Sequence, residues 1–324
     1  MGKPKISVTR QIPQAGIDLI EAEGFDLRYN NEDLALTREE LLDYVKGAGG
    51  IVTMLHDRVD VELIEAAKGI QVFSNYAVGF NNIDLDACRK RGIRVTNTPE
   101  VLTVATADLA MTLLLATARR VVETDVFLRE GKWEGWSPML FHGQDVTGKT
   151  LGIIGPGRIG QAVAERAAHG FKMRILFTCG DDPPPPVAWQ ESVGARGVDL
   201  DTLLAESDFA SIHTPLNEKT HHLIGNRELG LMKRTAILIN TARGPIVDEK
   251  ALVEALKSRT IGGAGLDVFE EEPKICPGLT DLPNSVLLPH LGSATVQTRT
   301  DMATLAARNL IAVLKGEEPP RAVV

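Results

Sequence analysis

The sequence is poor in cysteine and has no excess of basic residues. Only three cysteines occur in 324 residues, and an odd number without paired spacing argues against a disulfide framework or a zinc site. The net charge is −8. Domains that grip phosphate backbones carry a basic excess, so the charge argues against nucleic acid as a partner.

Long apolar runs are absent too. No stretch approaches the roughly 18 apolar residues that a membrane-spanning helix needs. The N-terminus MGKPKISVTRQ also lacks the apolar core of a signal peptide. Together with the low cysteine count, these absences predict a cytoplasmic protein without a membrane partner. Hydrophobic residues nevertheless make up 44% of the chain, which is enough for a packed core and excludes disorder as the main state.

The sequence does contain a regular alternation of short β-branched runs and longer amphipathic runs. This alternation predicts an α/β protein with parallel sheets, and the length predicts about two domains. One long helix, dense in apolar residues and therefore mostly buried, is expected over 101–129, and a closing helix over 295–315. The run from Pro183 to Pro186 predicts a stiff surface loop. Strands are expected at 5–10, 50–55, 70–75, 93–97, 150–155, 173–178, 208–213, 235–240, 262–268 and 285–290.

A glycine-rich turn joins the strand at 150–155 to the helix that follows. It reads Gly155-Pro156-Gly157-Arg158-Ile159-Gly160. In this context the first glycine allows a tight turn, the second admits a pyrophosphate, and the third lets the helix pack on the strand. The helix N-terminus adds free N–H groups for phosphates. The turn therefore predicts a dinucleotide site.

The end of the next strand normally holds the ribose of the cofactor. Cys179 stands where NAD-binding proteins place an acidic residue, and Gly180-Asp181-Asp182 follow it. No arginine that would suit the 2′-phosphate of NADP follows, so NAD is favoured.

Three residues with complementary chemistry follow successive strands in the last third of the chain. Arg243 follows the strand at 235–240, Glu272 follows 262–268, and His290 ends 285–290. Hydride transfer to a 2-keto acid needs a planar cation to hold the carboxylate and polarise the carbonyl. It also needs an imidazolium to deliver the proton and a carboxylate to hold that imidazole. The three residues therefore predict a dehydrogenase site.

The remaining histidines offer weaker settings for proton transfer. His213 ends a strand in His213-Thr214-Pro215, which fits a backbone contact to the cofactor better. The others either lie in a polar loop (His221, His222) or lack a nearby carboxylate in a comparable setting (His56, His142, His169).

The motifs G-P-G-R-I-G, H-T-P-L, N-T-A-R-G, L-D-V-F-E-E-E-P and L-P-H-L-G-S-A-T occur in this order. Together they resemble the D-isomer-specific 2-hydroxyacid dehydrogenases, and most of all the glyoxylate and hydroxypyruvate reductases. The resemblance implies two doubly wound parallel-sheet domains. A Rossmann cofactor domain would span 101–290, and a flavodoxin-like, discontinuous substrate domain would combine 1–100 with 291–324. It also implies NAD, with NADP as the alternative, a small 2-keto acid substrate, a homodimer and no metal.

The resemblance assigns roles to single residues. His290 would be the general acid and base, Glu272 its partner and Arg243 the substrate anchor. Substrate contacts would come from Leu55, Val78, Gly79 and, toward the neighbouring subunit, Trp136. Cofactor contacts would come from Thr106, Gly155, Pro156, Gly157, Arg158, Ile159, Gly160, Cys179, His213, Thr214, Pro215, Thr241, Ala242, Asp267 and Gly292.

Other functions within the same fold remain open. Relatives that act as NAD-sensing transcriptional corepressors share these motifs, and other members are D-lactate-type or phosphite-type enzymes. Phosphite-oxidising relatives carry a lysine where Val78 stands, so their anion anchor is missing here. Cys179 and Gly180 replace the Asp, or the Ser-Arg pair, of other members, which leaves the cofactor preference open.

Overall fold

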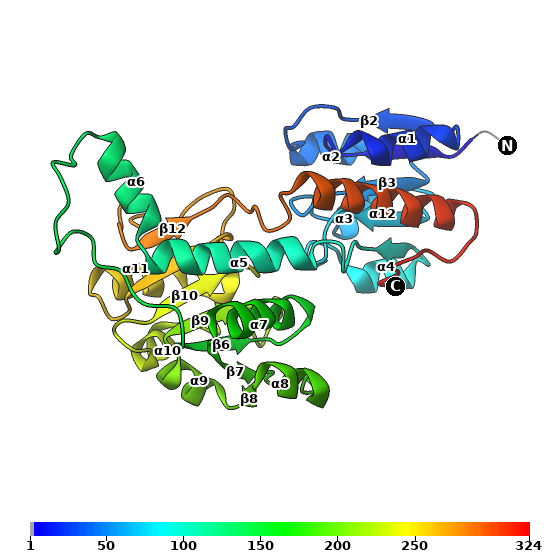
Figure 1. The fold of residues 1–324 in the computed structure, drawn as a ribbon. Helices are drawn as coiled ribbons and strands as arrows, with labels where there is room; N and C mark the ends of the chain where they lie inside the picture. Colours follow the sequence, from blue (N-terminus) through cyan, green and yellow to red (C-terminus); the bar gives the residue numbers. More distant parts are fainter. Residues whose placement is uncertain (1–2) are drawn as a thin grey trace. The chain divides into compact units, whose positions relative to one another are not determined.

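The computed structural model describes residues 3–324, which form two compact units (Figure 1). Unit 1 combines residues 3–102 with 293–324, and unit 2 comprises 103–292. Each unit contains one parallel sheet, with five strands in unit 1 and seven in unit 2. The assignment of substrate and cofactor to the two units stays a prediction.

The sheet of unit 1 has the strand order β2-β1-β3-β4-β5, which is the flavodoxin-like order. The inner strands β3 and β4 are buried along their whole length, as expected for strands covered on both faces. The strands are β1 (Lys5–Val8), β2 (Asp26–Tyr29), β3 (Gly50–Thr53), β4 (Val72–Asn75) and β5 (Arg94–Thr96). The helices are α1 (Gln14–Ala22), α2 (Arg38–Tyr44), α3 (Val61–Ala66), α4 (Leu85–Lys90) and α12 (Val296–Leu314).

The last helix, α12, completes unit 1 by packing on α1, β3, β4 and β5 (Figure 1). Gly16 of α1 lies so close that a Cβ there would be 2.8 Å from the carbonyl oxygen of Ala303. Ser74 of β4 donates its hydroxyl to the carbonyl oxygen of Ala306 at 2.8 Å. These contacts explain why the unit is discontinuous in sequence.

The sheet of unit 2 has the order β12-β11-β10-β9-β6-β7-β8. This is the Rossmann order with a seventh strand added. All strands are parallel, and successive strands are added on one side of β6 up to β8 and on its other side from β9 onward. The strands are β6 (Thr150–Ile154), β7 (Arg174–Thr178), β8 (Arg196–Gly197), β9 (Phe209–Ile212), β10 (Ile237–Asn240), β11 (Gly263–Leu266) and β12 (Ser285–Leu287). The helices are α5 (Thr103–Ala118), α6 (Val121–Arg129), α7 (Arg158–Phe171), α8 (Val187–Val193), α9 (Leu200–Glu206), α10 (Asn226–Leu231) and α11 (Glu249–Lys257).

The long helix expected over 101–129 is two helices. Arg120 has a φ of 54°, in the left-handed region, so the helix breaks there into α5 and α6. The expectation that most of this stretch is buried holds for α5 but is wrong for α6, which has no buried residue. In Figure 1, α6 and the segment after it stand out from the sheet of unit 2.

Four short elements were not expected from the sequence: β2, α2, β8 and α8. The strands β2 and β8 are edge strands of four and two residues, so neither carries a continuous apolar run. The helix α8 begins directly after the proline run, and Pro186 is its N-cap residue. Within the run, Pro185 is buried while its three neighbours are exposed.

None of the helices in residues 3–324 is both long and apolar enough to cross a membrane. In the same part of the chain, no three or more His, Cys, Asp or Glu side chains are grouped so that they could hold a metal ion.

Candidate active site

The three predicted catalytic residues follow three adjacent strands of unit 2. Arg243, Glu272 and His290 come after β10, β11 and β12, which are neighbours in the sheet. Because parallel strands end at the same edge, their loops meet there. Glu272 contacts His290 directly, and its charge also acts on Arg243. The structure therefore brings the three side chains together.

Glu272 and His290 form a hydrogen-bonded pair. Glu272 Oε2 lies 2.8 Å from His290 Nδ1. Desolvation alone would raise the pKa of Glu272, but the hydrogen bond and charge of His290, the N–H of Phe269 and the charge of Arg243 lower it. Glu272 is thus ionised at neutral pH. An ionised carboxylate only accepts hydrogen bonds, so His290 Nδ1 is the donor.

The backbone at His290 is held in an unusual conformation. Its φ is 56°, in the left-handed region that residues other than glycine rarely adopt. Its N–H donates to the carbonyl oxygen of Asp267 at 2.9 Å. The Asp267 carboxylate in turn accepts the N–H groups of Leu291 at 2.6 Å and Gly292 at 2.7 Å, and desolvation raises its pKa despite these bonds. Unusual backbone geometry held by its surroundings is frequent at functional sites. The imidazole itself is held by the hydrogen bond to Glu272.

The loop that carries Arg243 is fixed from two sides. Asn240 Nδ2 donates to the carbonyl oxygen of Arg243 at 2.9 Å. On the other side, Gly244 lies so close to Phe269 that a Cβ there would be 1.9 Å from the carbonyl carbon of Phe269. This contact seats the Arg243 loop against the loop that leads to Glu272. Desolvation lowers the pKa of Arg243 and the charge of Glu272 opposes this, so the guanidinium stays charged.

The glycine turn lies between β6 and α7, and its three glycines have different surroundings. Gly155 has a φ of 89°, and a Cβ there would be 2.8 Å from the backbone nitrogen of Thr214. A Cβ at Gly160 would be 2.4 Å from the carbonyl oxygen of Gly155. At Gly157, however, a Cβ would meet nothing within 4 Å. The open space over Gly157 faces the start of α7, where a pyrophosphate would meet free N–H groups.

The other predicted cofactor contacts line the same edge of the sheet. Thr241 Oγ1, at the end of β10, is buried and has no hydrogen-bond partner among residues 3–324, which is the state expected of a group that binds a ligand. Thr106 donates its hydroxyl to the carbonyl oxygen of Gly292 at 3.1 Å. Further contacts follow β7 (Cys179), β9 (His213, Thr214, Pro215) and β10 (Ala242). These surroundings fit a dinucleotide, which would supply the hydride when bound.

His213 is unsuited to proton transfer. Its Nε2 lies 2.8 Å from the hydroxyl of Ser211. Desolvation lowers the pKa of His213 to about 3, so the imidazole is neutral at physiological pH. A neutral side chain at this strand end is compatible with the predicted cofactor contact.

In unit 1, Val78 and Gly79 lie in a turn after β4 whose carbonyl groups are tied to asparagines. Asn97 Nδ2 donates to the carbonyl oxygen of Val78, and Asn75 Nδ2 to that of Gly79, both at 2.8 Å. The N–H groups of Val78 and Gly79 donate to no atom of the described chain. Successive unpaired N–H groups form a concave site for an anion, such as a carboxylate.

Comparisons with known proteins agree with this geometry. The family model "D-isomer specific 2-hydroxyacid dehydrogenase, NAD binding domain" matches residues 111–292. The glyoxylate reductase of Thermococcus litoralis is 52% identical over 325 residues, covering 99% of this chain and 97% of that protein. A crystal structure of a glyoxylate reductase from Paecilomyes thermophila has a TM-score of 0.87 at 34% identity, covering 100% of this chain and 99% of that one. The NADPH-dependent glyoxylate/hydroxypyruvate reductase of Sinorhizobium meliloti, in complex with NADP and malonate, has a TM-score of 0.86 at 33% identity, with coverages of 100% and 97%.

The chain belongs to the D-isomer-specific 2-hydroxyacid dehydrogenase family. It is an NAD(P)-dependent dehydrogenase that reduces a keto acid to a hydroxy acid. The family and the fold class expected from the sequence are both confirmed.

Sequence reasoning missed a brace behind the Glu272 loop of this dehydrogenase. Glu270 Oε1 accepts the N–H of Glu249 at 2.7 Å, and Glu249 Oε1 accepts the N–H of Glu270 at 2.8 Å. The second oxygen of Glu270 lies 2.9 Å from His222 Nε2. This reciprocal pair ties the first turn of α11 to the loop. No pattern in either segment alone could have indicated it.

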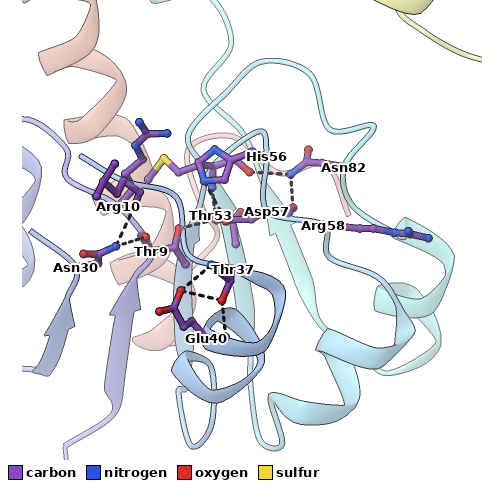
Figure 2. Close-up of polar contacts among 12 residues, drawn as sticks. Thr9, Arg10, Asn30, Thr37, Glu40, Thr53, His56, Asp57, Arg58 and Asn82 are labelled. Carbon is purple, nitrogen blue, oxygen red and sulfur yellow. Dashed lines mark hydrogen bonds and ion pairs between the residues drawn. The ribbon is translucent and has the colours of Figure 1, made fainter. Parts of the chain in front are cut away.

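His56 is expected to lack a nearby carboxylate in a comparable setting, and the structure places one beside it in a different setting, in unit 1. His56 Nε2 lies 3.4 Å from Asp57 Oδ1, and Asp57 is only 1% exposed. Asp57 Oδ2 accepts the hydroxyl of Thr9 and the N–H of Met54, which fixes the turn that carries Leu55. Figure 2 shows these contacts linking the ends of β1 and β3. Desolvation lowers the pKa of His56, so this imidazole is not favoured as a charged proton donor.

Trp136 is not placed with the other predicted site residues of unit 2. Its side chain is 84% exposed, on the segment that follows α6. Its predicted contact with a neighbouring subunit stays a prediction.

Proposed function

We propose that the chain reduces glyoxylate, and also hydroxypyruvate, to the corresponding 2-hydroxy acid, the D isomer in the case of hydroxypyruvate. The contact between His290 and Glu272 beside Arg243, at adjacent strand ends, carries this proposal. The names of the relatives above support the choice of substrate.

The proton that the reaction requires would come from His290. Because Nδ1 donates to ionised Glu272, Nε2 is the atom free to donate to the carbonyl oxygen of the substrate. Arg243 would polarise that carbonyl and hold the carboxylate with its planar guanidinium. In unit 1, the N–H groups of Val78 and Gly79 would bind a carboxylate of the substrate, with Leu55 against its apolar part.

The proposal is tested by replacing the proton donor. His290→Ala should lower kcat by about 10²–10⁴-fold, the usual contribution of a general acid, while NADH binding is retained. Arg243→Ala should raise KM as well as lower kcat. His169→Ala serves as the control, because His169 lies on α7 and its side chain has a single hydrogen-bond partner within residues 3–324, the carbonyl oxygen of Ser192 at 3.1 Å. Near-normal turnover of both keto acids by His290→Ala would contradict the assignment.

A sensor of NAD with the same fold is the second candidate function. The motifs alone support it, and the same steady-state assay separates it from the enzyme. Tight NADH binding without turnover of any 2-keto acid by the unmodified protein would favour the sensor.

We also infer a preference for NADH over NADPH. Cys179 ends β7, Gly180 follows with a φ of 56°, and the exposed Asp181 pairs with Lys219 Nζ at 2.6 Å. Lys219 neutralises Asp181, but the carboxylate of Asp182 beside it would repel a 2′-phosphate. The ratio of kcat/KM for the two cofactors tests this inference, and a ratio at or below one would refute it.

A homodimer is proposed from the exposed apolar surface of α6 and the segment after it. Val121, Val122, Val126 and Leu128 of α6, and then Trp133, Trp136, Met139 and Leu140, are each at least 40% exposed. A patch of this kind marks a protein interface. Sedimentation of the protein should give twice the chain mass, and Trp136→Ser combined with Met139→Ser should shift it toward one chain. The cytoplasmic location stays a prediction.

A further inference from the structure

A cavity of about 310 Å³ lies in unit 2, apart from the catalytic residues. Its wall includes Thr235, Gly262 and Ser285, which lie at the N-terminal ends of β10, β11 and β12. The catalytic loops follow the opposite ends of these same strands. Strands of three or four residues, at about 3.3 Å per residue, separate the two edges of the sheet by roughly 10–13 Å.

The charge of this cavity has the opposite sign to that of the whole chain. Three arginines line it, Arg120, Arg234 and Arg259, against a single carboxylate, Glu123. Glu123 is already bound by Arg120, with two contacts of 2.8 Å. The side chains of Arg234 and Arg259 are exposed and make no hydrogen bond or ion pair within residues 3–324. Two positive charges are therefore left unpaired beside one cavity in a chain of net charge −8.

Each arginine follows a helix end, which gives a simpler explanation of its position. Arg120, Arg234 and Arg259 come two or three residues after the ends of α5, α10 and α11. Cations at helix C-termini are stabilising by about 0.3–1 kcal/mol, and the negative ends of the helices would oppose an anion. Each helix end carries only about half an elementary charge, however, less than the full charge of the arginine after it. Arg120 is already paired with Glu123, so the net positive charge at the cavity comes from Arg234 and Arg259. Their two full charges exceed the summed partial charges of the three helix ends, which leaves a small net attraction for anions.

We propose that this cavity binds a small polyanion, with phosphate or carboxylate groups held by Arg234 and Arg259. Both groups match the planar fork of a guanidinium, which can donate two parallel hydrogen bonds. The volume is at the lower end of the range for small-molecule sites, which suits a compact ligand rather than a dinucleotide. Gln144 and the exposed His142 lie in the same wall, but Gln144 Nε2 donates to the carbonyl oxygen of Thr235 and His142 Nε2 lies against that of Pro138, both at 2.6 Å, so the proposal rests on the two arginines.

The test measures binding by titration calorimetry with NADH present at saturation, so that the glycine turn is occupied. The probes are pyrophosphate and citrate, one for each source of negative charge, with sodium chloride at matched ionic strength as the reference. We expect one probe to bind, and the double variant Arg234→Gln/Arg259→Gln to weaken it at least about tenfold. Arg308→Gln on α12, an exposed arginine with no side-chain partner in the described chain, should leave the affinity unchanged.

Three results would overturn the proposal. Neither probe binds beyond the chloride reference, or the double variant binds as tightly as the unmodified protein. In the third result, the double variant changes only the melting temperature or the sedimentation of the protein. The arginines would then stabilise the helix C-termini or form a contact between copies of the chain. Because binding is read without turnover, this outcome is independent of the proposed reaction.

Discussion

Replacing Gly244 with alanine tests whether the catalytic geometry depends on close packing of two loops. A Cβ at this position would lie 1.9 Å from the carbonyl carbon of Phe269 and 2.0 Å from its oxygen. Ordinary contacts of a Cβ begin near 3.4 Å, so the loops must separate by about 1.5 Å. Both contacts are with backbone, so no side chain can rotate to relieve them.

Two effects of Gly244→Ala should follow. Overpacking costs typically 1–3 kcal/mol, so the free energy of unfolding should fall by about 2 kcal/mol or more. Arg243, the neighbouring residue, should move relative to Glu272 by about 1 Å, and a misplacement of that size lowers catalysis by about 100-fold. The assay follows NADH consumption with glyoxylate, at a temperature where circular dichroism shows the variant folded.

A matched control is Gly230→Ala on α10, where a Cβ meets nothing within 4 Å. This variant should keep both stability and kcat/KM, because alanine is favoured over glycine within a helix. The affinity of Gly244→Ala for NADH should be retained, since the glycine turn lies in a different loop. If Gly244→Ala had the stability and kcat/KM of the unmodified protein, the close contact between Gly244 and Phe269 would contribute neither to folding nor to catalysis.

Two further predictions concern the cofactor and the pH. Gly157→Ala should not lower the melting temperature, because its Cβ enters open space and the unfolded chain loses entropy. It should nevertheless weaken NADH binding by at least about tenfold, measured by fluorescence titration; unchanged affinity would place the pyrophosphate elsewhere. Because the pKa of Glu272 is lowered from 4.5, its contribution to stability is present above that value and is lost as the pH falls through the lower, folded-state pKa. Glu272→Gln should therefore melt below the unmodified protein at pH 7, and the difference should shrink as the pH falls below 4.5 and through the folded-state pKa. A difference that stays constant from pH 7 into this acidic range would contradict the pKa shift.

The sequence was most informative where apolar residues fill a buried strand. The inner strands of both sheets were located by their apolar runs, and the polar residues after them indicated the catalytic edge. The edge strands β2 and β8 carry no such run and were missed, whereas the edge strands β5 and β12 lie within predicted strands. The interruption at Arg120 could not be predicted, because arginine has no intrinsic preference for a φ of 54°.

The site shows the same division between local and distant information. His290, Glu272 and Arg243 were identified because each follows a strand in a polar motif. The contact of Gly244 with Phe269 joins residues 25 positions apart, and no local pattern specifies it. The same holds for the brace formed by Glu249 and Glu270, and for the carboxylate of Asp57 bound to Thr9.

The three glycines of the turn differ in whether the fold itself requires them or only a bound ligand would. Gly155 and Gly160 are required by the protein itself, since a Cβ at either would collide with backbone. Gly157 is not, because nothing in the described chain lies where its Cβ would be. Glycine there lowers stability through the entropy of the unfolded chain, without any packing gain in return. A residue that the fold does not need, in open space at a helix N-terminus, is best explained by a ligand that approaches the backbone. The same reasoning separates Thr241, whose buried hydroxyl has no partner in the described chain, from Thr106, whose hydroxyl donates within the protein.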